Sequence, residues 1–383
     1  MRLAKAIFLI AVAFAASSRA QTQYYAAIDL GSKGSKGELF SFHKDTCPKE
    51  FVKKNSVPCQ VYGMIVNTKL VSSMKDGEFT GAGIQEATDA VKREMGEMHA
   101  AAKKNQLQNI TYFIVGSSGV AKSKNKDALA ASVKAATGID MDFIDAKREG
   151  YFGLVSAVTN EKLRPVSSYI DIGSGNTKLG CLVGGSDIGS FRNVEIPYGS
   201  VSGRNKGKEK NPTDIVAGIR QLMREELGPA YDKASMDAPC LRNRERIYWT
   251  GGAAWATATF MHPNQELRPT VIITKRDIDT FLARLSDGSW NQRHFQYSFP
   301  KDTSLAIQKD IRNAAEKDRQ RVMDTFVRED LLAGVSIMKT VLDSSNPSAV
   351  VRFIRDGGSF FYGYAAEKYP DERADEHAEE RHK

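Results

Sequence analysis

The stretch YYAAIDLGSKGSKGELFSF, residues 24–42, decides the fold. It begins with an apolar run from Tyr25 to Leu30 that contains one acid, Asp29. The next seven residues include three glycines, two serines and two lysines, whereas a tight turn needs only one or two such residues. The pattern predicts a strand, a glycine-rich turn and a second strand. Such a turn presents several backbone N–H groups on a concave surface that a phosphate can approach closely.

The same pattern returns at SSYIDIGSGNTKLGCLVG, residues 167–184. An apolar strand again leads to an aspartate, Asp171, a glycine-rich turn and a second strand. An internal repeat of this kind predicts two similar domains that face each other, not a solenoid. A third glycine turn follows a strand at IYWTGGAAWA, residues 247–256. Two phosphate-binding hairpins facing each other would hold a phosphate chain from both sides.

The rest of the chain alternates strand-like and helix-like segments, which predicts an α/β protein. Residues 270–345 are expected to be mostly helical, and the charged tail from Asp371 is expected to fray. The expected strands are 24–30, 37–42, 61–66, 112–116 and 141–144, and the expected helices are 84–104, 126–137 and 151–158.

Residues 1–20 predict a secretory signal peptide. Two basic residues precede an apolar run of eleven residues (6–16), and small residues follow at positions 18 and 20. The run is too short to span a membrane, and an uncleaved N-terminal anchor is the alternative. No second apolar run of membrane length follows. We expect cleavage before Gln21 and a periplasmic or secreted mature chain.

The charge and the cysteines set further limits. Removing residues 1–20 lowers the formal net charge from +8 to +5, which favours an anionic substrate. The dense basic patch of a nucleic-acid binder is missing.

In an oxidising compartment we expect a local disulfide between Cys47 and Cys59. Cys181 and Cys240 either pair or remain buried thiols, because sequence does not fix connectivity. The oligomeric state is left open.

The two aspartates need their own explanation, because a carboxylate beside a phosphate would repel it. Each makes sense if it holds a hydrated cation or a water, since Mg²⁺ keeps several waters and takes one or two carboxylates. Asp29 and Asp171 are therefore the predicted ligands of Mg²⁺ or another divalent cation, and an aspartate that merely opens a turn is the alternative. The residues predicted to bind phosphate are Gly31, Ser32, Gly34, Ser35, Gly173, Ser174, Gly175 and Asn176. Lys33 and Lys36 either neutralise the phosphate chain or are solvated.

On these motifs the chain resembles the actin/sugar-kinase/heat-shock ATPase superfamily, and within it the Ppx/GppA exopolyphosphatase/guanosine pentaphosphatase family. FIVGSSGVAKSKNKDAL (113–129) resembles the family segment that reads like TSAVREAKN. ATGIDMDFIDAKREGYFGLVSAV (136–158) is similar to the strand and helix that carry the catalytic glutamate. FIRDGGSFFYGYA (353–365) resembles the closing glycine-rich segment. DLGSKGSK and REGYFGLVSAV are also similar to apyrase motifs.

The resemblance implies two RNase-H-like (actin-like ATPase) domains facing across a cleft. The expected division is residues 21–160 and 161–368, with the last helix able to pack back on the first domain and a charged tail at 369–383. Glu149 becomes the expected catalytic base, although a glutamate in the first turn of a helix also suits the helix dipole. Ser117, Ser118 and Gly119 are implied to line the pocket near the terminal phosphate, and Gly251 and Gly252 to match the third superfamily turn.

The chain departs from the family at two places. Ala121 stands where an arginine is expected, and Lys122 or Lys124 cannot fork two phosphate oxygens as arginine does. Ser174 and Asn176 stand where the family usually has glycine and serine. The implied activity is hydrolysis of terminal phosphoanhydride bonds of polyphosphate or a guanosine polyphosphate. The alternatives are an apyrase-like nucleoside tri/diphosphatase, a catalytically weak phosphate-chain binding protein, and a kinase or chaperone-like ATPase, which is disfavoured outside the cytoplasm.

Overall fold

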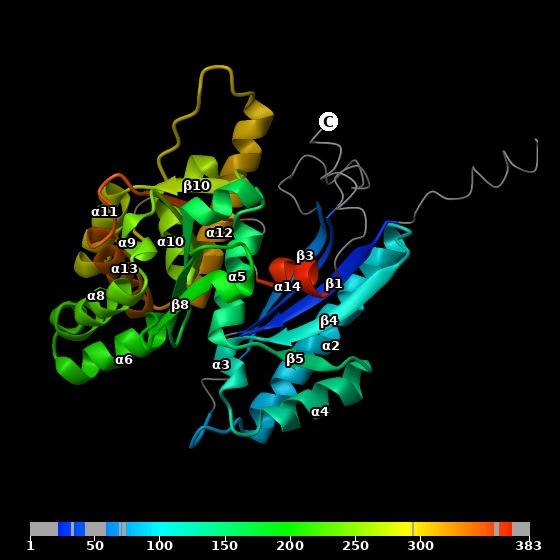
Figure 1. Ribbon diagram of the computed structural model, residues 1–383. Helices are drawn as coiled ribbons and strands as arrows, with labels where there is room; N and C mark the ends of the chain where they lie inside the picture. Colours follow the sequence, from blue (N-terminus) through cyan, green and yellow to red (C-terminus); the bar gives the residue numbers. More distant parts are fainter. Residues whose placement is uncertain are drawn as a thin grey trace, which may run out of the picture.

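The computed structural model describes residues 22–31, 34–42, 59–68, 70, 74–292, 295–355 and 360–369. Residues 1–20, Ser32, Lys33, Cys47 and the charged tail from Asp371 lie outside this part of the chain, and so do the predictions made for them. The described residues form two mixed β-sheets with helices packed on them (Figure 1). None of the helices in this part is long and apolar enough to cross a membrane.

The first sheet has the strand order β3-β2-β1-β4-β5. β1 is antiparallel to β2 and parallel to β4, so the predicted strand–turn–strand hairpin lies at its centre. The strands are β1 (Tyr24–Leu30), β2 (Gly34–Ser41), β3 (Cys59–Asn67), β4 (Ile110–Gly116) and β5 (Met141–Phe143). The helices of this half are α2 (Gly81–Lys104), α3 (Ser118–Ala121), α4 (Lys126–Thr137) and α5 (Ala146–Ala157).

The second sheet repeats this arrangement, with the order β10-β11-β9-β6-β7-β8. β6 is antiparallel to β7 and parallel to β9, as β1 is to β2 and β4. The internal repeat read in the sequence is thus a repeat of sheet topology. The strands are β6 (Ser167–Ile172), β7 (Thr177–Leu182), β8 (Phe191–Ile196), β9 (Arg246–Gly251), β10 (Thr270–Ile273) and β11 (Val350–Ile354).

The helices of the second half pack mainly around β6, β9 and β11 in one large apolar core. They are α6 (Ser200–Lys210), α7 (Ile215–Leu222), α8 (Gly228–Asp237), α9 (Cys240–Asn243), α10 (Gly252–Met261), α11 (Lys275–Asp287), α12 (Leu305–Thr325) and α13 (Arg328–Asp343). A π-helical segment, η5 (Met223–Leu227), joins α7 to α8, and short 3₁₀ helices lie at η3 (Glu161–Val166), η4 (Ile188–Ser190) and η6 (Pro263–Gln265).

Helix α5 lies between the two sheets (Figure 1). Its Leu154 packs with Tyr169 of β6, whereas its Phe152 packs in the cluster that contains Tyr25 of β1. Gly153 permits the close approach to the second sheet, because a Cβ atom there would lie 2.2 Å from the Tyr169 ring. Helix α5 therefore packs against residues of both sheets that contain the repeated hairpins.

The chain returns to the first sheet at its end. Helix α14 (Phe361–Lys368) packs against α5 and β1 and contributes Phe361, Tyr362 and Tyr364 to the cluster of Tyr25 (Figure 1). Successive side chains of a strand point to opposite faces. β1 therefore buries Tyr25 against α14 and α5 but Ile28 against α2. Asp29 shares the face of Tyr25, which directs it toward α5.

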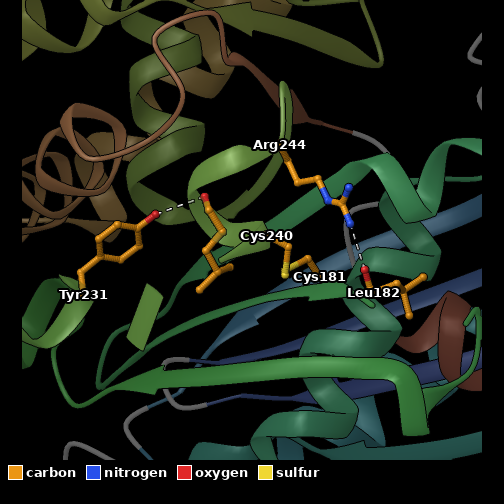
Figure 2. The surroundings of a disulfide bond; sticks show 6 residues. Cys181, Leu182, Tyr231, Cys240 and Arg244 are labelled. Carbon is orange, nitrogen blue, oxygen red and sulfur yellow. Dashed lines mark hydrogen bonds between the residues drawn. A yellow bond between two sulfur atoms is a disulfide. The ribbon is translucent and has the colours of Figure 1, made fainter. Parts of the chain in front are cut away.

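Cys181 of β7 and Cys240 of α9 form a disulfide bond, so the pairing that the sequence left open exists (Figure 2). Two nearby hydrogen bonds to backbone carbonyls hold the same region: the Tyr231 hydroxyl donates to Leu241 at 3.3 Å and Arg244 donates to Leu182 at 3.2 Å. Cys59 is also disulfide-bonded. Its expected partner, Cys47, lies outside the described residues.

Candidate active site between the two sheets

The two repeated aspartates lie near the carboxyl ends of corresponding strands. Asp29 precedes the last residue of β1, and Asp171 precedes the last residue of β6. Each has a lysine as its cross-strand partner: Asp29 pairs with Lys36 and Asp171 with Lys178. The local geometry of the two hairpins is therefore the same up to this point.

Glu149 lies in the first turn of α5, whose N-cap Asp145 accepts a hydrogen bond from the backbone of Arg148. The Glu149 side chain is buried. Its Oε2 atom accepts a hydrogen bond from the backbone N–H of Ser118 at 2.8 Å. Its Oε1 atom accepts another from Nζ of Lys178, also at 2.8 Å. Both carboxylate oxygens of the expected base are therefore held by groups from other elements.

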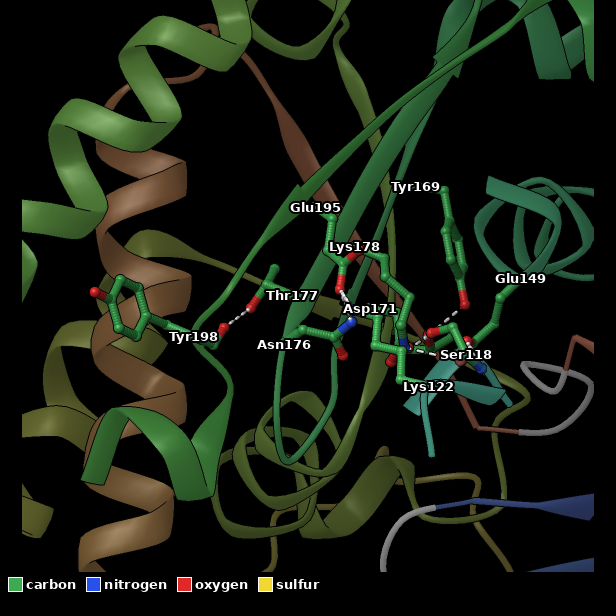
Figure 3. Close-up of polar contacts among 11 residues, drawn as sticks. Ser118, Lys122, Glu149, Tyr169, Asp171, Asn176, Thr177, Lys178, Glu195 and Tyr198 are labelled. Carbon is green, nitrogen blue, oxygen red and sulfur yellow. Dashed lines mark hydrogen bonds and ion pairs between the residues drawn. The ribbon is translucent and has the colours of Figure 1, made fainter. Parts of the chain in front are cut away.

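Lys178 connects this glutamate to the second hairpin. Its Nζ atom lies 2.7 Å from Oδ2 of Asp171 as well as 2.8 Å from Oε1 of Glu149 (Figure 3). The lysine side chain is only 5% exposed. Burial by itself would lower the pKa of Lys178, but the charges of Asp171 and Glu149 raise it above its usual value. The lysine therefore stays charged and acts as counter-ion to both carboxylates.

Asp29 is the corresponding acid of the first hairpin. Burial raises the pKa of Asp29 to about 8, and the negative charges of Glu149 and, more weakly, Asp171 act in the same direction. Lys36 and Lys178 oppose this shift. The Oδ1 atom of Asp29 is buried and has no hydrogen-bond partner among the described residues. The raised pKa favours the protonated form of this carboxyl.

A second set of contacts positions Asp171. The hydroxyls of Tyr169 and Thr250 lie 2.6 Å apart, and Thr250 in turn donates to Oδ1 of Asp171 at 3.4 Å. Gly251 makes room for this carboxylate: its φ is 97°, and a Cβ atom there would lie 3.0 Å from Oδ1 of Asp171 and 2.4 Å from the carbonyl oxygen of Ile172. Any side chain at Gly251 would displace the aspartate.

The turn of the second hairpin is supported by the start of α6. The backbone N–H of Ser200 donates to the carbonyl of Gly173, and those of Val201 and Ser202 donate to that of Ser174. The Ser202 hydroxyl donates to the carbonyl of Gly175 at 2.7 Å. The turn's carbonyls therefore point toward α6.

The remaining predicted residues lie around these carboxyls or farther away. The Asn176 amide donates to Glu195 at 2.5 Å, and Lys122 pairs with the same glutamate. Lys124 donates to the carbonyl of Asp76. The Trp249 side chain lies in the core of the second half. Ser117, Ser118 and Gly119 form the start of α3, and Gly252 begins α10. A 2.8 Å backbone hydrogen bond between Gly31 and Gly34 closes the first turn, and Ser35 is buried on β2.

The expected Mg²⁺ ion can be tested on this set of donors. Mg²⁺ is bound in proteins through one or two carboxylates and several waters. Asp171 and Glu149 each use an oxygen to bind Lys178. In the part of the chain that the structure describes, no group of three or more His, Cys, Asp and Glu side chains is arranged to hold a metal ion. The residues therefore do not fit Mg²⁺ between the two aspartates while Lys178 is in place.

Sequence reasoning missed Lys178, Tyr169, Thr250 and Glu195. A signal for Lys178 was present, because both repeats place a lysine seven positions after the aspartate, which is the cross-strand position of these hairpins. Thr250 and Glu195 come from other strands, and no local pattern marks them.

No protein-family model and no curated protein matches this chain. Solved structures do match it. The Ppx/GppA phosphatase of Aquifex aeolicus, type II variant, superimposes with a TM-score of 0.59 at 15% identity, over 91% of this chain and 99% of that one. An exopolyphosphatase from Cytophaga hutchinsonii gives 0.60 at 16% identity, over 90% and 98%. The chain thus has the two-domain fold of these phosphatases, as the resemblance predicted; at this identity the likeness concerns the fold.

Proposed function

We propose that this chain is a phosphohydrolase that cleaves the terminal phosphoanhydride bond of polyphosphate or a guanosine polyphosphate. The observation that carries the proposal is the position of Glu149, which meets Asp171 through Lys178 and lies close enough to Asp29 to raise its pKa. The second hairpin and the helix between the sheets thus meet at Lys178, and the charge of Glu149 also acts on Asp29 of the first hairpin. The names of the matching structures, a Ppx/GppA phosphatase and an exopolyphosphatase, support the same chemistry.

In the proposed reaction a water attacks the terminal phosphorus. The new P–O bond forms as the bond to the bridging oxygen breaks, and the electron pair leaves with the shortened phosphate chain. Glu149 accepts the proton of the water. Because charge is spread over the phosphoryl oxygens, positioning and electrostatic stabilisation provide most of the rate enhancement. Lys178 supplies a positive charge at the carboxylates.

A second candidate function is binding of phosphate chains without turnover. Two observations favour it. Both carboxylate oxygens of Glu149 are already engaged, by Lys178 and by the backbone of Ser118, and Ala121 on α3 offers no arginine fork to a phosphate. An apyrase-like nucleoside tri/diphosphatase is the third candidate, favoured by the similarity of the sequence around Glu149 and Gly150 to apyrases.

A substrate panel separates these functions. Polyphosphate, ATP, ADP, GTP and guanosine pentaphosphate are each incubated with Mg²⁺, Ca²⁺ or chelator, and phosphate release and binding are measured. Glu149→Gln should lower phosphate release by about 10²–10⁴-fold, because glutamine keeps the shape but cannot take a proton. Glu209→Gln, an exposed glutamate paired with Lys206 on α6, is the control. Retention of most activity in Glu149→Gln would remove this residue as the base. Binding without release in the wild type would establish the second candidate.

The proposed location is the periplasm or the outside of the cell. It rests on the pattern of residues 1–20 and is in keeping with the Cys181–Cys240 disulfide, since such bonds persist in oxidising compartments. The mature chain should begin at Gln21. Intact-mass measurement of the exported, unreduced protein tests this cleavage together with the expected Cys47–Cys59 bridge, and free thiols at both positions would exclude that bridge.

A further inference from the structure

The ammonium group of Lys178 occupies the place between the two carboxylates that a metal ion was expected to neutralise. Its Nζ atom lies 2.7 Å from Asp171 and 2.8 Å from Glu149, although the three side chains come from β7, β6 and α5. Figure 3 shows the three side chains pointing toward one another. The lysine is buried, so this contact belongs to the packed interior of the site.

The neighbouring lysines are engaged elsewhere. Lys36 lies 2.6 Å from Glu38 on its own strand, and Lys122 pairs with Glu195. Lys178 is thus the cation that the described structure brings to both Glu149 and Asp171. An ammonium has three donors, and two of them are used by these carboxylates. Nζ also lies near the predicted phosphate-binding turn, because a Cβ atom at Gly173 would be 3.7 Å from it.

We propose that Lys178 is a built-in cation of this site, which replaces a divalent ion between Glu149 and Asp171 and also serves as a phosphate-binding group. The protein then needs no divalent ion of its own at these carboxylates. A second cation there would be repelled by the ammonium and would compete with it for the same oxygens. The role toward phosphate rests on the proposed function, whereas the exclusion of a metal ion rests on the contacts alone.

Binding of Mn²⁺ in the absence of substrate tests the exclusion. Electron paramagnetic resonance of free Mn²⁺ is recorded as the protein is added. The wild type should leave Mn²⁺ free at millimolar concentration. Lys178→Met removes the ammonium and leaves the carboxylates unpaired, so it should bind one Mn²⁺ per chain at least about tenfold more tightly. Adding Asp171→Asn to Lys178→Met should abolish this gain.

Lys210→Met is the matched control, because Lys210 also bridges two carboxylates, Glu225 and Glu226, at 3.1 and 2.7 Å, but belongs to α6. It should bind Mn²⁺ no better than the wild type. A wild type that binds one Mn²⁺, lost in Asp171→Asn, overturns the proposal. So does a folded Lys178→Met that gains no affinity. If Lys178→Met does not fold, the wild type and Asp171→Asn still decide, because they need no change at the lysine.

The same proteins distinguish failure of this proposal from failure of the proposed function. Polyphosphate binding is measured in chelator, where Lys178→Met should weaken it at least about tenfold and Lys210→Met should not. The wild type could release no phosphate from any substrate while Mn²⁺ and polyphosphate bind as expected. The proposed hydrolase function would then be wrong, and the proposal that Lys178 is a built-in cation would be supported. If polyphosphate binding needs Mg²⁺ and is unchanged in Lys178→Met, the built-in cation fails, whatever the turnover.

Discussion

The two repeated hairpins share their backbone but not their electrostatics. In each, an aspartate near the end of the first strand has a lysine as its cross-strand partner. In the first hairpin Lys36 is 29% exposed and binds Glu38. In the second, Lys178 is 5% exposed and binds Asp171 and Glu149. The repeat therefore determines the strand position of the lysine, and the elements packed on each hairpin determine which carboxylate its side chain binds.

The difference follows from what packs on each hairpin. Glu38, the partner of Lys36, also accepts a hydrogen bond from the Tyr362 hydroxyl of α14, which holds this glutamate beside the first hairpin. The second hairpin faces the start of α5, which brings Glu149 within reach of Lys178. Among the described residues Asp29 forms no ion pair and burial raises its pKa to about 8, whereas Asp171 is paired with a lysine. The two copies of the motif thus place their aspartates in different electrostatic surroundings.

The largest expected effect on stability separates the two lysines. Lys178→Met should lower the free energy of unfolding by about 3–5 kcal/mol, because it leaves two buried carboxylates without their counter-ion. Lys36→Met should cost less, about 1–3 kcal/mol, because it leaves one buried carboxylate, Glu38, which keeps the Tyr362 hydroxyl. Urea unfolding at pH 7 measures both. Equal losses would show that the two hairpins are electrostatically equivalent.

A smaller effect separates the two aspartates. Asp171→Asn should cost about 1.5–3 kcal/mol at pH 7, because it removes the charge that binds Lys178. Asp29→Asn should be nearly neutral at that pH, since it replaces a carboxyl that is already protonated.

Stability curves against pH add a second test of the same pair. An acid whose pKa is raised on folding costs stability as pH rises from its unfolded value, about 4, to its folded value, here about 8. In the wild type the free energy of unfolding should decline over this pH range. Asp29→Asn should reduce the slope of that decline by at most about 1.4 kcal/mol per pH unit. Equal slopes for the wild type and Asp29→Asn between pH 5 and 8 would mean that Asp29 is ionised in the folded protein.

Glu94 sharpens the comparison within the first domain. It lies on α2 against Gly37, on the opposite face of β2 from Lys36, and burial raises its pKa to about 8. Because the unfolded chain releases this proton near pH 4.5, Glu94 also lowers stability as pH rises toward 8. Glu94→Gln should flatten that decline without changing phosphate release or Mn²⁺ binding. The exposed Glu86→Gln on the same helix is the control. A loss of activity in Glu94→Gln would place the residue in the site.

Much of the fold could be predicted because its signals are local. The strand–aspartate–glycine pattern at Asp29 and Asp171 predicted two hairpins, and both exist at the centre of sheets with the same pairing. Gly138 ends α4 in the left-handed conformation, with a φ of 77°, where the sequence predicted the helix to end. Glycine, aspartate and alternating apolar residues act on the backbone within a few positions, so a single segment contains the information.

The site could be predicted only in part. The sequence indicated Glu149, Asp29 and Asp171 as its carboxyls, and it contained the lysine spacing that puts Lys178 opposite Asp171. It did not determine that Lys178 would reach Glu149, that Asp29 would keep its proton, or that Cys181 would join Cys240. Those outcomes depend on burial and on distances between segments far apart in the chain. They were decided when α5 packed between the two sheets, because ion pairing and desolvation act through space and not along the sequence.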